Sequence, residues 1–289
     1  MSPRQAGEPG RIWIVSPIYF DVPSWLVVRD RLDHALDSNP AYAGLERRFT
    51  LLDDSVGADP AIDELRNLEG VRVLTPPHNL GNQKAIVYAL RELLPEFADE
   101  DLVVTMDADG EDSPEDVPSL LDGLGVSSSD PMRVVLAKRA GRRRGVFTMQ
   151  AFYPVYRVLF ALLTGVTAAT GNFASYRGST AKSMMVLPRF DRVYSASLIS
   201  SNDLARTLVP CRKGERVEGR PKIGFRQHCR HAVAMLEPFS RRILRRALVL
   251  IVALALAALL ILLISDRSSA AAAPAGKAES GHWRRLANR

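Results

Sequence analysis

Apolar residues in the first half of the chain fall into two alternating patterns. Short runs of aliphatic and β-branched residues that end at Pro, Asp or a polar loop predict strands over 11–16, 49–52, 71–74, 102–106 and 132–137. Between these runs, apolar residues three or four positions apart predict helices over 25–36, 59–68, 82–94 and 114–124. This alternation predicts an α/β fold with a doubly wound, mostly parallel sheet.

The pattern changes after residue 147. Residues 152–163 combine aromatic and aliphatic residues with few charges, which suits a core helix or a helix lying on a bilayer surface. Residues 247–264 are 18 consecutive apolar residues without a charge, close to the shortest length that spans a membrane. A buried core helix is the alternative for 247–264. The transmembrane interpretation is favoured, and it favours the interfacial interpretation of 152–163.

Basic residues flank the apolar run. Four arginines lie between residues 241 and 246, and by the positive-inside rule they predict a cytoplasmic flank. We therefore expect a single-pass membrane protein with its catalytic part on the cytoplasmic face. The tail over 266–289 is rich in Ala, Ser and Gly and is expected to be disordered.

The net charge of +6 conceals a strong charge asymmetry. Residues 1–132 contain 10 Lys/Arg and 25 Asp/Glu, residues 133–240 contain 19 and 5, and residues 241–289 contain 9 and 2. The basic part predicts an anionic partner such as a phosphate or a membrane surface. It contains no recognisable nucleic-acid-binding motif, so no nucleic-acid partner is expected. Two cysteines do not make a disulfide framework and fit a reducing compartment.

The densest group of carboxylates follows the predicted strand at 102–106. An extended backbone would place Asp107, Asp109 and Glu111 on the same side, where they would repel one another. A hard divalent cation such as Mg²⁺ or Mn²⁺, bridging to a phosphorylated ligand, would relieve this repulsion. A solvated acidic turn, or a helix N-terminus capped by Asp112 or Ser113, is the alternative.

Polar loops follow several of the other predicted strands. Pro17, Asp53-Asp54 and the 75–81 loop all come directly after a strand, as Asp107-Ala-Asp109 does. Ligands of open parallel sheets bind beyond the C-terminal strand ends. These four segments are therefore expected to converge on one crevice.

Five motifs in this order resemble inverting family 2 glycosyltransferases with the GT-A fold, above all the polyprenyl-phosphate glycosyltransferases such as dolichyl-phosphate mannosyltransferase. They are Val15-Ser-Pro-Ile-Tyr19, Asp53-Asp54-Ser55, Asn79-Leu-Gly81 with Ala85 beyond it, Asp107-Ala-Asp109 followed by Asp112 and Pro114-Glu115, and Arg216-Val-Glu-Gly219-Arg-Pro-Lys222. The resemblance covers roughly residues 10–240 and the membrane anchor.

The resemblance implies metal-dependent transfer of a sugar from a UDP- or GDP-linked donor to a polyprenyl phosphate, undecaprenyl or dolichyl. It implies Mg²⁺ or Mn²⁺ on Asp107, Asp109 and Glu111. The implied nucleotide-sugar contacts are Pro17, Tyr19, Asp53, Asp54, Asn79, Gly81, Lys84 and Asp107. The implied catalytic set is Asp107, Asp109, Asp112, Arg139, Arg216 and Lys222.

The implied domain organisation has five parts. They are a tail over 1–10, a nucleotide-sugar-binding core over 11–146, an acceptor-side region over 147–240, an anchor over 241–265 and a tail over 266–289. A phosphate acceptor needs cations rather than a general base, because a phosphate monoester with a second pKa of about 6 is already ionised at neutral pH. Arg142-Arg143-Arg144 could serve the acceptor phosphate or anionic lipid headgroups equally well.

The chain departs from the family pattern at several positions. Phe20-Asp21 replace Asn-Glu, Gly110 replaces Leu, Glu111 replaces Gln and Pro221 replaces Ser, and the Asp that often precedes Gly-Phe is absent from Thr170–Phe173. One alternative is a hydroxyl acceptor, which would need a carboxylate base such as Asp112. Another is a membrane-anchored protein that binds nucleotide without turnover. Homo-oligomerisation stays open.

Overall fold

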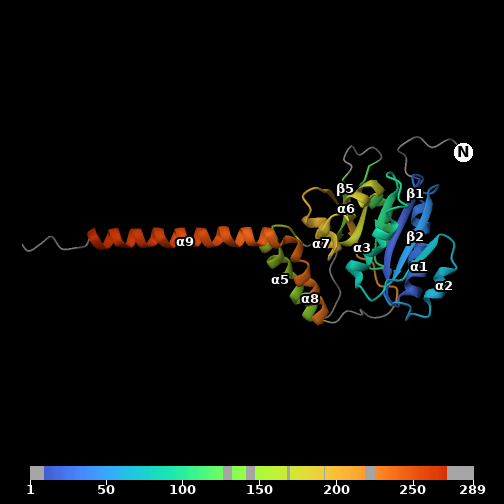
Figure 1. The fold of residues 1–289 in the computed structure, drawn as a ribbon, viewed down its shortest axis with the longest axis horizontal. Coiled ribbons are helices and arrows are strands. Elements are labelled where there is room, and N and C mark those ends of the chain that lie inside the picture. The colour runs from blue at the N-terminus through green and yellow to red at the C-terminus, as the bar shows by residue number, and fades with distance from the viewer. Residues whose placement is uncertain are drawn as a thin grey trace, which may run out of the picture. The chain divides into compact units, whose positions relative to one another are not determined.

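The computed structural model describes residues 10–125, 132–140, 147–167, 170–191, 193–218 and 225–271. The chain divides into two compact units, residues 1–240 and 241–289, and each is described by itself. The first unit contains the sheet and most of the helices (Figure 1). The second unit consists, within the described residues, of one long helix.

Seven strands form one sheet within the described residues. The strands are β1 (Arg11–Ile18), β2 (Glu46–Asp53), β3 (Val71–Leu74), β4 (Leu102–Thr105), β5 (Arg133–Ala140), β6 (Thr170–Arg177) and β7 (Ala205–Arg212). Their order across the sheet is β3-β2-β1-β4-β6-β5-β7. Only β6 runs antiparallel to its neighbours, β4 and β5. The α/β fold with a mostly parallel sheet is therefore confirmed.

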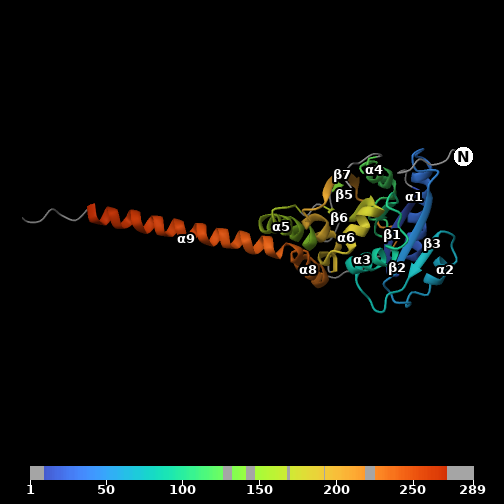
Figure 2. The same cartoon turned by 45° about the horizontal axis from the view of Figure 1, so that its top comes forward.

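Helices cover the sheet because alternate strand residues point to opposite faces and both sets are apolar. The helices of the first unit are α1 (Val22–Asp37), α2 (Ile62–Arg66), α3 (Asn82–Leu93), α4 (Val117–Asp122), α5 (Phe147–Thr164), α6 (Gly178–Met185), α7 (Tyr194–Ser200) and α8 (Phe225–Ala234), with short 3-10 turns η1 (Pro114–Asp116), η2 (Pro188–Asp191) and η3 (Glu237–Phe239). α1, α2 and α4 share a core with the even-numbered β1 residues Ile12 and Ile14. α3 lies against β1 and β2 outside that core (Figure 2).

Two strands of the sheet were not predicted by apolar patterning. β6 has the sequence Thr-Gly-Asn-Phe-Ala-Ser-Tyr-Arg, in which small and polar residues outnumber aliphatic ones. It is nevertheless central, and Phe173, Ala174 and Ser175 are buried. β7 is an edge strand whose residues are mostly partly exposed, so it lacks a continuous apolar run. The sheet therefore includes strands from both sides of residue 146.

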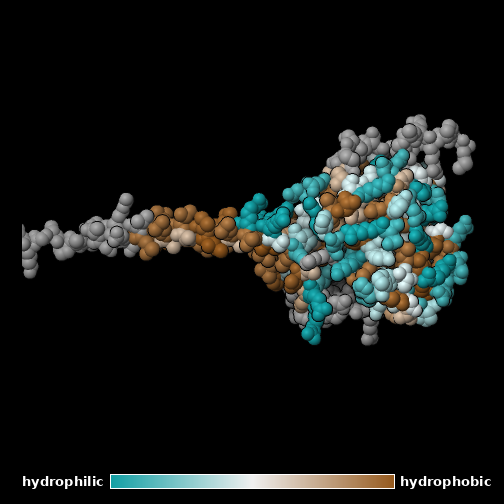
Figure 3. Space-filling model, viewed as in Figure 1, coloured by the Kyte–Doolittle hydropathy of each residue, from teal (hydrophilic) through white to brown (hydrophobic). Residues whose placement is uncertain are grey.

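α5 carries an apolar stripe on its exposed side. Along it Val155, Val158, Leu159, Leu162 and Leu163 are between 40% and 67% exposed, at the three- and four-residue spacing of one helix face. The opposite side of α5 is buried, where the Phe160 ring packs edge-on against Phe239 with centroids 5.4 Å apart. Apolar surface over α5 is visible in Figure 3. One face of α5 thus packs inside the first unit, and the opposite face is exposed.

The second unit holds α9 (Ser240–Ala271). Within the described parts of the chain, the helical stretch around residues 229–262 is the one segment long and apolar enough to cross a membrane. Leu, Ile and Val side chains from Leu248 to Leu262, and Ile264, are exposed around the helix. An apolar surface on all sides over this length is the pattern that a membrane-crossing helix has.

Packing of α1 on the sheet predicts a large stability effect. Leu32 is 1% exposed and contributes to the shared core. Leu32→Ala should lower the free energy of unfolding by about 2–5 kcal/mol, because it removes buried methyl groups and leaves a cavity. Val27→Ala on the same helix, at a side chain 42% exposed, is the control and should have little effect. Denaturant titration of the detergent-solubilised chain, monitored by circular dichroism, measures both; equal losses would contradict the packing.

Candidate active site

The candidate site lies at the C-terminal edge of the parallel strands. β1 pairs in parallel with both β2 and β4, so their C-terminal ends lie side by side. The segments that leave these ends are residues 19–21, 54–57 and 106–112. Three of the polar segments predicted to converge are therefore neighbours, and the 79–81 loop joins them through hydrogen bonds to Asp54.

Asp107 is held by amide side chains from two other elements. Its Oδ1 accepts hydrogen bonds from Asn82 Nδ2 at 2.9 Å and Asn172 Nδ2 at 3.2 Å. Its backbone N–H donates to Asp112 Oδ2 at 3.0 Å, and Asp112 is only 1% exposed. Residues 106–112 are called the carboxylate loop below. Asp112 thus supports this loop as a buried hydrogen-bond acceptor, an arrangement that does not favour its sequence-predicted use as a base.

Asp109 is a buried carboxylate of the loop with a raised pKa. Its Oδ1 accepts a hydrogen bond from the Glu111 backbone N–H at 2.8 Å, and its Oδ2 forms an ion pair with Arg216. Burial, reinforced by the negative charge of Asp107, raises the pKa of Asp109 from 3.8 to about 7. Glu111 forms a further ion pair with Lys213 Nζ at 3.2 Å. Two carboxylates of the loop, Asp109 and Glu111, are therefore paired with cations, Arg216 and Lys213.

Asp53 and Asp54 organise the neighbouring loops. Asp53 is fully buried, and its two carboxylate oxygens accept hydrogen bonds from the backbone N–H groups of Ser55 and Gly57 at 3.0 and 2.8 Å. Asp54 accepts hydrogen bonds from the Leu80 and Gly81 N–H groups at 2.6 and 2.9 Å. Burial raises the pKa of Asp54. Both residues position the loops, and a direct nucleotide contact by Asp53 stays a prediction.

The other predicted nucleotide contacts occupy different environments. Pro17 is buried within β1, and Tyr19 directly beyond the strand is 43% exposed. Phe20 is equally exposed, and its ring packs edge-on against Tyr19. Asn79 donates from Nδ2 to the Asp54 carbonyl at 2.6 Å, and Lys84 is exposed in the first turn of α3. The two aromatic rings and Lys84 are therefore accessible to a ligand.

A network of uncharged polar side chains behind Asp107 was missed by sequence reasoning. Gln83 Oε1 accepts hydrogen bonds from the Ser195 N–H at 2.9 Å and hydroxyl at 2.8 Å, while Gln83 Nε2 donates to Asn172 Oδ1. Asn172 in turn donates to Asn82 Oδ1. The sequence feature that could have indicated this network is the position of Asn82 and Gln83 immediately after the Asn79–Gly81 motif. The network ties α3, β6 and α7 to the carboxylate loop.

The side chains of most predicted phosphate-binding cations lie outside the described part of the chain. Arg139 lies near the C-terminal end of β5, where its backbone pairs with Cys211, but its side chain lies outside the described part. Lys222 and the Arg142–Arg144 cluster fall outside the described residues altogether. Arg216 is the one member of the predicted cation set whose side chain is described at the site.

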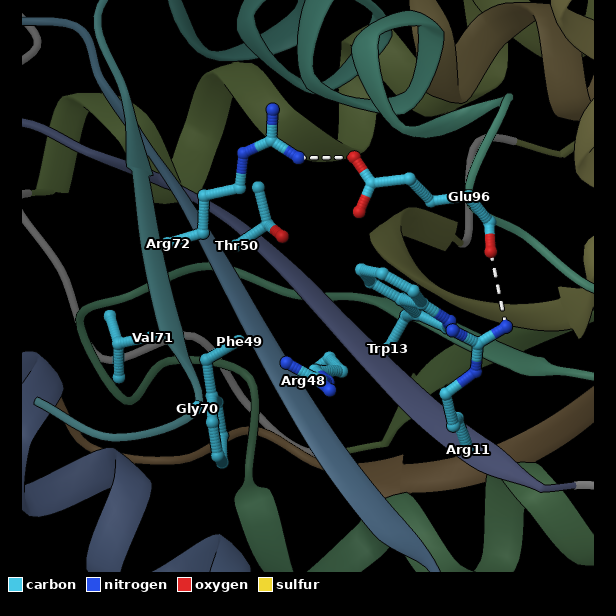
Figure 4. Close-up of a pocket in the computed structure, with 9 residues that line it drawn as sticks. All are labelled: Arg11, Trp13, Arg48, Phe49, Thr50, Gly70, Val71, Arg72 and Glu96. Atoms are coloured by element: carbon cyan, nitrogen blue, oxygen red, sulfur yellow. Dashed lines mark hydrogen bonds and ion pairs between the residues drawn. The ribbon is translucent and has the colours of Figure 1, made fainter.

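A separate hollow of about 230 Å³ lies at the opposite, N-terminal edge of β1, β2 and β3 (Figure 4). Three arginines line it, and each is paired with a carboxylate: Arg11 with Asp101, Arg48 with Glu46 and Arg72 with Glu96. The hollow is remote from the C-terminal strand ends, and its charges are already balanced. It is therefore not the candidate active site.

The carboxylate loop suits a hard divalent cation that arrives with a phosphate. Within the described residues, no group of three or more Asp, Glu, His or Cys side chains forms a ready-made metal site. Mg²⁺ usually takes only one or two protein carboxylates and completes its shell with substrate phosphates and water. The all-oxygen donors of Asp107 and Asp109 fit that coordination.

Comparison with known proteins identifies the family. A sequence profile described as "Glycosyl transferase family 2" matches residues 13–179, more than half of the chain. The chain therefore belongs to glycosyl transferase family 2 and is a glycosyltransferase. A search of curated proteins found no match to this chain.

Solved structures with a similar fold include three informative examples. A structure titled "Crystal Structure of a Mycobacterial Protein" has a TM-score of 0.55 at 20% identity, covering 81% of this chain and 76% of its own. Glucosyl-3-phosphoglycerate synthase from Mycobacterium tuberculosis, with Mn²⁺ and UDP-glucose, has a TM-score of 0.54 at 18% identity, with 81% and 80% coverage. Mannosyl-3-phosphoglycerate synthase from Rubrobacter xylanophilus has a TM-score of 0.50 at 16% identity, with 82% and 75% coverage. At these identities the likeness establishes the GT-A fold.

The raised pKa of Asp109 predicts how stability depends on pH. The folded state binds the Asp109 proton more tightly than the unfolded chain, whose Asp pKa is near 3.8. Without added metal, the unfolding free energy should therefore fall as pH rises from about 4 to 7, by about 1.4 kcal/mol for each unit of pKa difference. Asp109→Asn should flatten this decline.

Thermal unfolding of the metal-free protein at pH 5 and 7.5 measures the effect. Asp203→Asn is the control, because Asp203 is exposed and remote and forms an ion pair with Arg189. The control should retain the wild-type pH dependence. An unchanged slope in Asp109→Asn would show that this carboxyl does not titrate in the expected range.

Proposed function

We propose that this enzyme transfers a sugar from a nucleotide sugar to a polyprenyl phosphate at a membrane surface. One observation carries the proposal. The acidic loop at the strand ends faces the basic segment around Arg216, in a chain that continues at Ser240 into a helix long and apolar enough to span a membrane. A donor diphosphate suits the acidic loop through a metal, and an anionic acceptor suits the basic segment.

The donor side follows from the accessible groups near these strand ends. Tyr19 and Phe20 offer aromatic faces to a base. The 79–81 loop is hydrogen-bonded to Asp54, and the exposed Lys84 follows it. Mg²⁺ or Mn²⁺ would be held by Asp107 and Asp109, with Glu111 as a further oxygen donor. When bound, the cation supplies Lewis-acid stabilisation of the departing diphosphate. Asn82 and Asn172 fix the Asp107 carboxylate for that task through their hydrogen bonds.

The acceptor side needs cations rather than a base. A phosphate monoester with a second pKa of about 6 is largely ionised at neutral pH and can attack without losing a proton. Arg216, Arg139 and Lys222 are the candidates for binding the acceptor phosphate, and an arginine can bind it through a bidentate contact. A hydroxyl acceptor would require an exposed carboxylate base, whereas Asp112 is buried beneath the loop.

The membrane source of the acceptor phosphate is supported by two apolar surfaces. The exposed stripe of α5 over 155–163 suits contact with the headgroup–acyl boundary, as an interfacial helix makes. α9 supplies the spanning segment, and the arginines over 241–246 at its start favour a cytoplasmic location for the first unit. Two proteins with a similar fold are a glucosyl-3-phosphoglycerate synthase, crystallised with phosphoglyceric acid, and a mannosyl-3-phosphoglycerate synthase, so a soluble phosphorylated acid is the competing source of the same phosphate chemistry.

Removal of one aspartate tests the catalytic assignment. Asp109→Ala should lower sugar transfer by about 100-fold or more, because it removes an electrostatic contact to the departing diphosphate. The assay incubates the detergent-purified full chain with labelled UDP- and GDP-sugars, Mn²⁺ or Mg²⁺, and either undecaprenyl or dolichyl phosphate. Product is separated by extraction into organic solvent.

Controls define the outcomes of this assay. Asp203→Ala, at the exposed ion pair with Arg189, should leave transfer unchanged. Transfer to 3-phosphoglycerate with none to the lipid would replace the membrane acceptor by a soluble one. Wild-type rates of sugar transfer to the lipid by Asp109→Ala would contradict the proposal that transfer depends on a metal. Equal rates of sugar transfer with and without divalent cations would contradict it as well.

A further inference from the structure

The carboxylate loop is covered by a segment that directly follows β7. This strap, defined as residues 213–217, is joined to the loop by backbone hydrogen bonds from Gly214 N to the Glu111 carbonyl and from Val217 N to the Asp109 carbonyl, both 3.0 Å. An isolated antiparallel bridge also pairs Asp112 with Lys213. The strap and the loop therefore form one structural unit, although about 100 residues separate them in sequence.

Two glycines permit this close approach. Gly110 adopts φ +87, and a Cβ there would lie 3.0 Å from Val217 Cγ2 and 3.2 Å from the Glu215 carbonyl oxygen. A Cβ on Gly214 would lie 2.0 Å from the Gly110 carbonyl oxygen, which is impossible without moving the backbone. Gly110 is one of the positions where the chain departs from the family pattern, and the strap explains why a larger residue is absent.

The strap pairs one cation with Asp109 and another with Glu111. Arg216 pairs with Asp109, and its other terminal nitrogen lies 3.3 Å from Asp21 Oδ1. Lys213 pairs with Glu111, the second departure from the family pattern. Both ion pairs are largely enclosed, since the side chains of all four residues are at most 25% exposed. The extra carboxylate at Glu111 thus has its own counter-charge in the strap.

We propose that Arg216 and Lys213 are internal counter-cations of the carboxylate loop, which keep a divalent cation out until it arrives with a nucleotide diphosphate. This inference rests on the proposed function, because it assumes a metal–diphosphate donor. Arg216 occupies the Asp109 oxygen that a metal would take, and its positive charge also repels a free cation. A diphosphate offers Arg216 an alternative anion in the same crevice, so the guanidinium can turn from Asp109 to the phosphates as the metal binds.

Arg216 is therefore a positioning residue that couples metal binding to nucleotide binding. A purely structural role would predict something different: loss of Arg216 would loosen the strap and disturb the loop, without improving metal binding. The Arg216 Nε has no hydrogen-bond partner within the described residues, so the guanidinium is incompletely satisfied in its present position. That observation favours an Arg216 side chain that can exchange hydrogen-bond partners over one that only holds the strap in place.

Direct measurement of Mn²⁺ binding tests the inference without relying on turnover. Electron paramagnetic resonance counts free Mn²⁺ in titrations of the full chain in detergent at pH 7.5, first alone and then with UDP or GDP. Arg216→Gln should tighten binding of Mn²⁺ alone by about tenfold or more, because a competing charge has been removed from the site. Adding UDP or GDP should tighten Mn²⁺ binding more in the wild type than in the variant.

Two further variants complete the experiment. Arg189→Gln, remote from the loop and bonded to Ser201 and Asp203, is the matched control and should bind Mn²⁺ like the wild type. Lys213→Gln should also tighten binding of Mn²⁺ alone, and it carries the test if Arg216→Gln does not fold. Unchanged or weaker binding of Mn²⁺ alone in both strap variants would overturn the inference while leaving the proposed function intact. Absence of Mn²⁺ binding by the wild type with either nucleotide would overturn both.

Discussion

The carboxylate loop at the end of β4 imposes the constraint on which the rest of the site depends. Parallel strands deliver Asp107 and Asp109 to a partly buried edge, where burial and mutual repulsion raise the pKa of Asp109 to about 7. Such a loop is stable only with hydrogen-bond donors and cations around it. Asn82 and Asn172 supply the donors, and Lys213 and Arg216 supply the charges.

The strands beyond β4 bring hydrogen-bond donors and cations to the carboxylate loop. β6 enters antiparallel between β4 and β5 and carries Asn172 to the carboxylate loop. β7 pairs with β5 at the far edge, and its continuation returns across the loop as the strap. The second half of the chain is therefore part of the catalytic unit of this family 2 glycosyltransferase, because it supplies both support and counter-charge to the donor side.

Charge and apolarity together connect the site to a membrane surface in the proposed function. The acidic first 132 residues contain the loop, and the basic residues 133–240 contain the strap and the exposed apolar stripe of α5. An acceptor with a phosphate head and a long hydrocarbon tail complements these two surfaces at once. The Arg216–Asp109 ion pair joins the basic part of the chain to the acidic part.

The sequence by itself determined the features that depend on local patterns. Strand–helix alternation predicted the α/β sheet and its first five strands, the carboxylate spacing predicted the acidic loop, and the uninterrupted run over 247–264 predicted a helix of membrane-spanning length. Each follows from residues close together in the chain, where side-chain periodicity has a direct structural meaning.

Only the tertiary structure decided which groups meet at the loop. The Arg216–Asp109 pair joins residues 107 positions apart, and Asn172 reaches Asp107 across 65 positions. These contacts depend on strand order and on the antiparallel insertion of β6, which periodicity does not encode. For the same reason the sequence did not show that Asp112 and Asp53 are buried and hydrogen-bonded to the backbone of the loops. Their predicted roles at the ligand stay predictions.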